Sequence, residues 1–233
     1  MTNTSRALKR TKQPILQENI SPSPWNMSPN SKQPSFLKAI ETGFPHPAIV
    51  VMCGLPATCK TWAASIISQR HGFEHLRTDI IRKELLGKKD IFKEKVASNM
   101  KQREKIYDVM FDRAEKIASQ HKGVILDATF VKQTLRERAA VLAVTQRFPL
   151  VLVHTECPED IALRRISART IESFESNAIT PQAYYNNLSA FEPIDLGGLK
   201  KKFPSLDIVY FRVDTSVLDP EKWVVREYVN KAG

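Results

Sequence analysis

The segment from Ala48 to Thr61 constrains the fold of this chain more than any other part of it. An apolar run at 48–53 leads into the loop Gly54-Leu55-Pro56-Ala57-Thr58-Cys59-Lys60-Thr61. The loop matches the phosphate-binding pattern G-x-x-x-x-G-K-[ST] at every defined position except Cys59, where the pattern has glycine. A buried strand, a tight turn at Gly54 and a helix beginning near Lys60 would let successive backbone N–H groups surround an anion. The segment therefore predicts a strand, a phosphate-binding loop and a helix.

Each polar residue of this loop has a separate expected role. Lys60 supplies a positive charge to the β- and γ-phosphates of a nucleotide, and the Thr61 hydroxyl is a magnesium ligand. At the first turn of a helix we expect Cys59 to have a negative φ, so its side chain would crowd the phosphate without straining the backbone.

Length and charge set the broad class. The 233 residues carry a net charge of +10, which permits a polyanionic partner such as nucleic acid, although spread-out charge is more often ordinary solvated surface. Three cysteines do not make a disulfide framework and fit a reducing cytoplasm. No apolar run approaches the roughly 18 to 20 residues of a membrane span, so we expect no membrane partner.

Composition divides the chain in two. Residues 1–46 are basic and rich in proline and serine, which predicts a mostly disordered tail with at most one short helical turn at 36–40. Residues 47–233 alternate strands with helices. Expected strands lie at 48–53, 73–77, 124–126, 150–156 and 207–213. Expected helices lie at 60–70, 80–120 with a break near Gly87, 134–146, 158–169, 180–190 and 220–229.

This alternation predicts an α/β fold, a three-layer α/β/α sandwich around a mostly parallel sheet. Ligands of such sheets bind outside the carboxyl ends of the strands. One of those ends carries Asp79, followed by Arg82 on the same helix face. Asp79 would accept a proton from an acceptor hydroxyl and Arg82 would hold an anionic acceptor. Equally, Asp79 would be only the N-cap of the following helix.

Two further strand ends carry charged side chains. Asp127 ends the apolar run 124–126 as the aspartate of a Walker-B strand does, which predicts support for a magnesium site. Arg165 and Arg169 are four residues apart and share a helix face, so they either reach the moving phosphoryl group from a helical lid or form a solvated basic face. Arg136, after Asp127, has the same two interpretations.

Together these blocks resemble the P-loop kinases often described as AAA-type ATP-binding or "predicted kinase" domains, and they are similar to the kinase domain of polynucleotide 5′-kinases. The resemblance covers about 47–229. It depends on five blocks in order: Gly54-Leu55-Pro56 with Lys60-Thr61; Thr78-Asp79-Ile80-Ile81-Arg82; Leu126-Asp127-Ala128-Thr129-Phe130 with Arg136; Cys157-Pro158-Glu159 with Arg165 and Arg169; and Phe191-Glu192-Pro193.

The resemblance implies roles for these residues. The loop from Gly54 to Thr61 would bind ATP with Mg²⁺, and Asp79 would be the general base. Arg82, Thr129 and Arg136 would contact the acceptor. Asp127 would support the magnesium ion. Arg165 and Arg169 would be arginines of a lid. The chain departs from the family by having Ala57 and Cys59 where glycine is usual.

Three functional hypotheses follow. The first is an ATP-dependent phosphotransferase whose acceptor is the hydroxyl of a small molecule or the 5′-hydroxyl of a nucleic acid. The second is a degenerate P-loop protein, altered at Cys59, which serves as a nucleotide-binding or interaction module. The third is a nucleotide-dependent switch without an acceptor. The sequence shows no motif that separates ATP from GTP and no basic stripe interleaved with aromatic residues.

Overall fold

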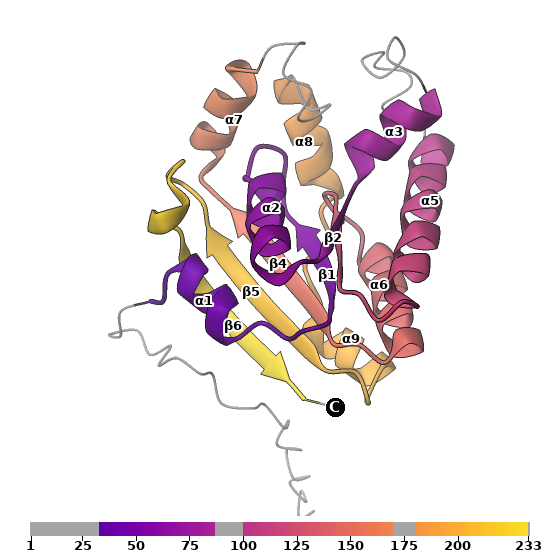
Figure 1. Cartoon of the computed structure of the whole chain (residues 1–233). Helices are drawn as coiled ribbons and strands as arrows, with labels where there is room; N and C mark the ends of the chain where they lie inside the picture. The colour runs from indigo at the N-terminus through magenta and orange to yellow at the C-terminus, as the bar shows by residue number, and fades with distance from the viewer. Residues whose placement is uncertain (1–32, 87–99, 170–179, 233) are drawn as a thin grey trace, which may run out of the picture.

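A six-stranded sheet forms the centre of the computed structural model, which describes residues 33–86, 100–169 and 180–232 (Figure 1). The strands are β1 (Ile49–Cys53), β2 (Glu74–Arg77), β3 (Val124–Asp127), β4 (Leu150–Glu156), β5 (Ile208–Asp214) and β6 (Val224–Lys231). Their order across the sheet is β2-β3-β1-β4-β5-β6. All neighbouring pairs are parallel except β5 and β6. The carboxyl ends of the first five strands therefore lie along one edge.

Helices cover the sheet and stand along that edge (Figure 1). They are α1 (Phe36–Thr42), α2 (Lys60–His71), α3 (Thr78–Leu86), α5 (Met100–Ala118), α6 (Gln133–Gln146), α7 (Glu159–Ser167), α8 (Pro181–Ala190) and α9 (Leu196–Lys202). One hydrophobic cluster joins the sheet to α5, α6 and α9, and a second joins it to α1 and α2. A third, smaller cluster joins the loop after β1 to α7 and α8.

The two main clusters cover opposite faces of the sheet, which explains why the sequences of the central strands are continuously apolar. Ile49 and Val51 of β1 face the α5–α6 layer, whereas Val50 and Met52 face the α1–α2 layer. All five residues of β1 are buried, as expected for a parallel strand covered on both faces. The expected three-layer α/β/α sandwich with a mostly parallel sheet is confirmed.

The expectation of a helix at 220–229 was wrong. A single 3₁₀ turn, η1 (Pro220–Lys222), is followed by β6, which pairs antiparallel with β5. Trp223 and Val225 are fully buried. Alternate burial and β-branched residues favour a strand here, and the open edge of β5 supplies hydrogen-bond partners that no local pattern reveals.

The boundary expected between the tail and the folded domain, at residue 46, was also wrong, because the folded part of the chain begins earlier. Ser35 caps α1 by accepting a hydrogen bond from the Lys38 amide. Phe36 and Ile40 are fully buried, and the Phe36 ring lies 5.8 Å from that of Trp223. Burial of each such side chain contributes roughly 1.5–3 kcal/mol, so residues 33–46 belong to the folded domain. Residues 1–32 lie outside the described residues.

The long polar region at 80–120 forms α3 and α5, and its expected break near Gly87 lies outside the described residues. Helix α9 was not expected, because it contains Gly197 and Gly198. Asp195 caps it by accepting a hydrogen bond from the Gly198 amide at 2.7 Å, and Leu199 is buried against the sheet. A cap and one buried contact therefore outweigh the low helix propensity of glycine.

Candidate active site

The loop between β1 and α2 has the curled backbone of a phosphate-binding loop. Gly54 has a φ of 135°, Ala57 of 64° and Cys59 of 59°. The expected negative φ at Cys59 was therefore wrong. Both non-glycine residues adopt the left-handed conformation in which the chain turns its N–H groups toward one side, and each does so at a steric cost that glycine avoids.

Close packing beneath the loop requires its first glycine. A Cβ at Gly54 would lie 2.4 Å from the carbonyl oxygen of Thr155, at the end of β4. Thr58 Oγ1 lies 2.8 Å from Thr155 Oγ1 and donates to the carbonyl oxygen of Leu55 at 2.9 Å. The loop is therefore held directly against β4.

Lys60 lies inside the curl of the loop. Its Nζ donates to the carbonyl oxygen of Leu55 at 2.6 Å. Burial lowers the pKa of Lys60 to about 8, although the negative charge of Asp127 acts in the opposite direction. A bound phosphate would favour the charged ammonium in the same way. Burial also raises the pKa of the neighbouring Cys59 thiol, so this cysteine is not an activated nucleophile.

Two oxygen-bearing side chains line the cavity together with Lys60. Thr61 and Asp127 both line the same cavity, and Asp127 is 5% exposed with its Oδ2 3.0 Å from His75 Nε2. Among the described residues there is no group of three or more His, Cys, Asp and Glu side chains that would hold a metal ion alone. A hydroxyl and one carboxylate nevertheless fit Mg²⁺, which is commonly bound by one or two carboxylates together with substrate phosphates.

Asp79 lies in the first turn of α3, at the carboxyl end of β2. Because the helix begins at Thr78, Asp79 is not its N-cap residue. Arg77 holds the Asp79 carboxylate by two hydrogen bonds of 3.2 and 2.7 Å. The side chain of Asp79 is 19% exposed and lines the cavity together with that of Arg82. The Asp79 carboxylate is therefore held in a fixed direction at the cavity wall.

The two arginines expected in a lid differ in their surroundings. Arg165 on α7 donates to the carbonyl oxygens of Ala57 at 3.1 Å, Thr215 at 2.7 Å and Ser216 at 3.0 Å. Arg169 follows the end of α7, and both side chains line the cavity. Neither is therefore part of a purely solvated basic face.

Arg136 does not line the cavity. It is fully buried on α6, where its guanidinium donates to the carbonyl oxygens of Phe130 at 3.0 Å, Pro193 at 3.0 Å and Glu192 at 2.8 Å. These contacts join α6 to the segment that precedes α9. Thr129, the other residue expected near the acceptor, does line the cavity.

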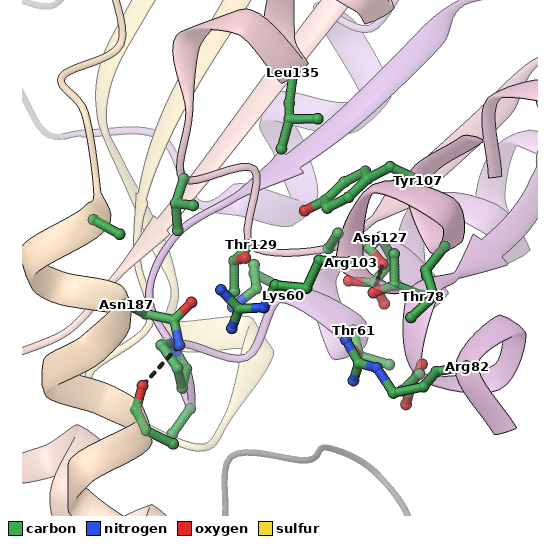
Figure 2. Close-up of a pocket in the computed structure, with 18 of the residues that line it drawn as sticks. Lys60, Thr61, Thr78, Arg82, Arg103, Tyr107, Asp127, Thr129, Leu135 and Asn187 are labelled. Carbon is green, nitrogen blue, oxygen red and sulfur yellow. Dashed lines mark hydrogen bonds between the residues drawn. The ribbon is translucent and has the colours of Figure 1, made fainter. Parts of the chain in front are cut away.

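The cavity encloses about 960 Å³ and connects the phosphate loop with α3, α5 and α8 (Figure 2). Two of its residues on α5, Arg103 and Tyr107, were missed in the sequence. They are four positions apart and share a helix face, but that face became a candidate only after α5 was placed opposite α3. The cavity is therefore large enough for more than a phosphate group.

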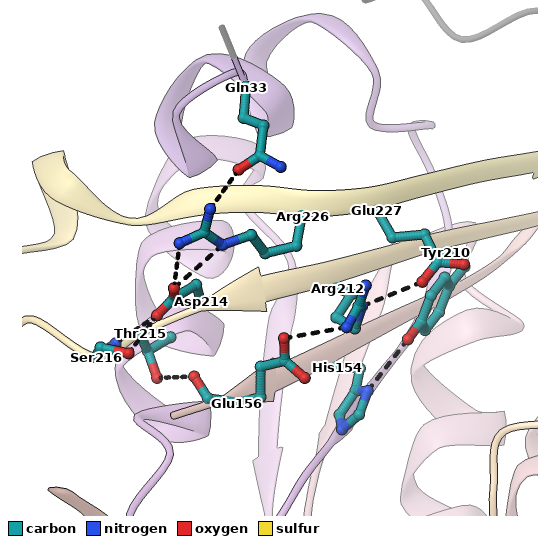
Figure 3. Close-up of polar contacts among 10 residues, drawn as sticks. All are labelled: Gln33, His154, Glu156, Tyr210, Arg212, Asp214, Thr215, Ser216, Arg226 and Glu227. Carbon is teal, nitrogen blue, oxygen red and sulfur yellow. Dashed lines mark hydrogen bonds and ion pairs between the residues drawn. The ribbon is translucent and has the colours of Figure 1, made fainter. Parts of the chain in front are cut away.

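Polar side chains of β4, β5 and β6 also contact one another (Figure 3). The carboxylate of Asp214 pairs with Arg226 at 2.7 Å, and Glu156 accepts from Arg212 at 3.4 Å. These contacts join β4 to β5 and β5 to β6, next to the carbonyl oxygens of Thr215 and Ser216 that Arg165 contacts.

The AAA domain family profile matches residues 49–194. No curated protein matched the chain. Solved structures match its fold at low identity. A putative kinase from Chloroflexus aurantiacus J-10-fl aligns with a TM-score of 0.56 and 18% identity over 75% of this chain and 91% of that chain. A sugar kinase from Janibacter sp. HTCC2649 aligns with a TM-score of 0.51 and 14% identity over 71% and 85%.

The AvrRxo1-ORF1:-ORF2 complex with ATP aligns with a TM-score of 0.55 and 14% identity over 82% of this chain and 60% of that chain. At these identities the similarity concerns the fold alone. In the part of the chain that the structure describes, no helix is long and apolar enough to cross a membrane. The profile match covers more than half of the chain, and this protein is therefore a member of the AAA domain family with a P-loop kinase fold.

Proposed function

We propose that this protein is an ATP-dependent phosphotransferase that moves the γ-phosphoryl group to a hydroxyl acceptor. The main support is that a phosphate-loop lysine, Lys60, and a fixed carboxylate, Asp79, line one cavity. The P-loop kinase fold agrees with this reaction. The acceptor is either a small molecule or the 5′-hydroxyl of a nucleic acid.

Asp79 acts as the general base in this proposal. Its carboxylate takes the proton from the acceptor hydroxyl, the hydroxyl oxygen attacks the γ-phosphorus, and the bond from that phosphorus to the ADP oxygen breaks. Arg77 fixes the direction of this carboxylate through the two hydrogen bonds.

Positively charged side chains of the protein stabilise the negative charge of the transferred phosphoryl group. Lys60 lies within the loop that would hold the β- and γ-phosphates, and Arg169 lines the same cavity. Such preorganised charge is commonly a large contribution to phosphoryl transfer. Thr61 and Asp127 would hold the magnesium ion of ATP·Mg, which supplies further positive charge to the phosphates.

The backbone at Cys59 favours one alternative function. A left-handed φ on a non-glycine residue costs roughly 1–2 kcal/mol, and its side chain lies in the cavity. If this cost and crowding prevent nucleotide binding, the protein is a degenerate P-loop module that acts through a partner.

Calorimetry with ATP·Mg on the wild-type chain and on Lys60→Ala separates the two functions. We expect micromolar binding that the variant loses, because Lys60 is the only lysine that lies inside the described loop. Absence of wild-type binding would favour the degenerate module.

Turnover tests the role of Asp79. In an assay of ADP release with a panel of hydroxyl compounds, we expect Asp79→Asn to bind ATP normally and to lose about 10²-fold or more in turnover. Asp108→Asn is the matched control, because Asp108 pairs with Arg138 on the protein surface at 2.8 Å. Equal turnover in Asp79→Asn and the control would contradict the assignment of the base.

A further inference from the structure

Two arginines face the acceptor side of the cavity from different helices. Arg82 on α3 and Arg103 on α5 both line it (Figure 2). Asp79 lines the same cavity. Arg82 is partly buried and Arg103 is exposed. Burial lowers the pKa of the Arg82 guanidinium, and the positive charge of Arg103 adds to that effect. The two side chains are thus close enough for their charges to repel each other.

Neither guanidinium pairs with a carboxylate within the described ranges 33–86, 100–169 and 180–232. Asp79, whose negative charge acts on Arg82, already accepts two hydrogen bonds from Arg77. Other arginines of the same region are paired, since Arg113 contacts Glu84 at 2.5 Å. Two like charges at one cavity wall are unfavourable unless an anion lies between them.

Another part of the wall is apolar. Ile106 and Tyr107 of α5 and Leu135 of α6 line it, and the Tyr107 hydroxyl is engaged with Thr129 and the Phe130 backbone. The whole cavity of about 960 Å³ also has to hold the nucleotide. Small-ligand sites typically occupy about 300–1,000 Å³, so the space that remains suits a small molecule.

We propose that the acceptor is a small hydroxyl compound that also carries a phosphate or carboxylate group, and that Arg82 and Arg103 bind this anionic group beside Asp79. This inference rests on the phosphotransferase function proposed above. A planar guanidinium from each of two helices would clamp the anion from two sides, which fixes the hydroxyl of the same molecule against the base.

Inorganic phosphate tests the site without knowledge of the acceptor. The protein is first saturated with a non-hydrolysable ATP analogue and Mg²⁺, which occupies the phosphate loop, and phosphate binding is then measured by calorimetry. We expect wild-type binding in the millimolar range and an affinity at least about tenfold weaker in Arg82→Gln with Arg103→Gln.

Matched variants make this result specific. Arg113→Gln removes a guanidinium from α5 outside the cavity and should leave phosphate affinity unchanged, because an exposed ion pair contributes little to stability. Arg82→Lys and Arg103→Lys retain the charge and should bind phosphate more tightly than the glutamine variants. They also serve as the test if the double variant does not fold.

The outcomes distinguish this inference from the proposed function. If the analogue binds and the double variant binds phosphate as the wild type does, or if the wild type binds no phosphate, the anion site is overturned while the nucleotide site stands. If the analogue does not bind the wild type, the phosphotransferase function fails, and the inference fails with it.

Matched acceptors complete the test. ADP release is compared for glycerol, glycerate and glycerol 3-phosphate, for ribose and ribose 5-phosphate, and for an oligonucleotide with a 5′-hydroxyl. We expect turnover with anionic small molecules and a KM raised about tenfold or more in Arg103→Gln. Turnover confined to the uncharged alcohols, or to the oligonucleotide, would overturn the inference.

Discussion

The guanidinium of Arg165 on α7 donates a hydrogen bond to the carbonyl oxygen of Ala57 in the phosphate loop, 3.1 Å away. Its other terminal nitrogen reaches the carbonyl oxygens of Thr215 and Ser216, just after β5. One side chain therefore connects α7, the phosphate loop and the end of β5. In this structure Arg165 positions the loop, whatever part it has at the phosphoryl group.

We expect Arg165→Gln to lower the free energy of unfolding by about 1–3 kcal/mol, because carbonyl oxygens are left without their charged donor. Nucleotide affinity should fall with it, since Ala57 is no longer held. Urea unfolding and calorimetry measure the two effects. Arg164→Gln is the control, because Arg164 pairs only with Asp160 on the surface, and its effect should be within about 0.5 kcal/mol. Unchanged stability in Arg165→Gln would contradict the positioning role.

Gly54 should tolerate no side chain. In Gly54→Ala the new Cβ would lie 2.4 Å from the Thr155 carbonyl oxygen at a φ of 135°, so we expect a loss of nucleotide binding and a destabilisation above about 3 kcal/mol. Gly72→Ala is the matched comparison. Gly72 also has a positive φ, of 66°, but nothing lies within 4 Å of its Cβ position, so it should cost only about 1 kcal/mol. Similar losses in the two variants would show that contact with Thr155 does not matter.

Replacement of Cys59 by glycine tests how much the loop is impaired. Cys59→Gly removes the left-handed strain, of roughly 1–2 kcal/mol, but gives the unfolded chain more freedom, so the net stabilisation should stay below about 1 kcal/mol. ATP·Mg affinity should rise less than about tenfold if the natural loop already binds nucleotide. Cys59→Ala keeps the strain and removes the thiol. A rise of more than about 100-fold in Cys59→Gly alone would support the degenerate module.

Acid should destabilise the fold through His154. This side chain stacks on Phe191 and its Nδ1 lies 3.1 Å from the Tyr210 hydroxyl. Burial lowers its pKa to about 4, and the charges of Arg136 and Arg212 act in the same direction. Between pH 6.5 and 4 only the unfolded state takes up the proton, so stability is complete above pH 6.5 and decreases by up to about 3 kcal/mol as the pH falls to 4.

His154→Gln isolates this contribution. Glutamine still reaches the Tyr210 hydroxyl but does not titrate, so the free energy of unfolding of the variant should depend less on pH between 4 and 6.5. Other groups titrate equally in both proteins, and the difference between the two urea-unfolding series therefore reports His154 alone. Parallel pH profiles would contradict the prediction.

Local sequence was sufficient for the phosphate loop and for the polar strand ends. The loop is recognised from the fixed spacing of Gly54, Lys60 and Thr61 after a continuous apolar run. This spacing is informative because a short loop between a buried strand and a helix has few possible conformations. Asp127 ends β3 and Asp79 lies two residues after β2, and parallel strands bring their carboxyl ends to one edge. Both therefore line the cavity where the pattern predicted.

Tertiary contacts decided the rest. The segment 224–231 became a strand because β5 offered an open edge, and residues 36–42 became a core helix because Trp223 was there to pack against. Arg136 is held in the interior by four backbone carbonyls, two of them far along the chain. Arg103 reaches the cavity only because α5 packs beside α3. Sequence spacing determines which residues share a face of one element, whereas the energy of burial between distant elements determines what that face meets.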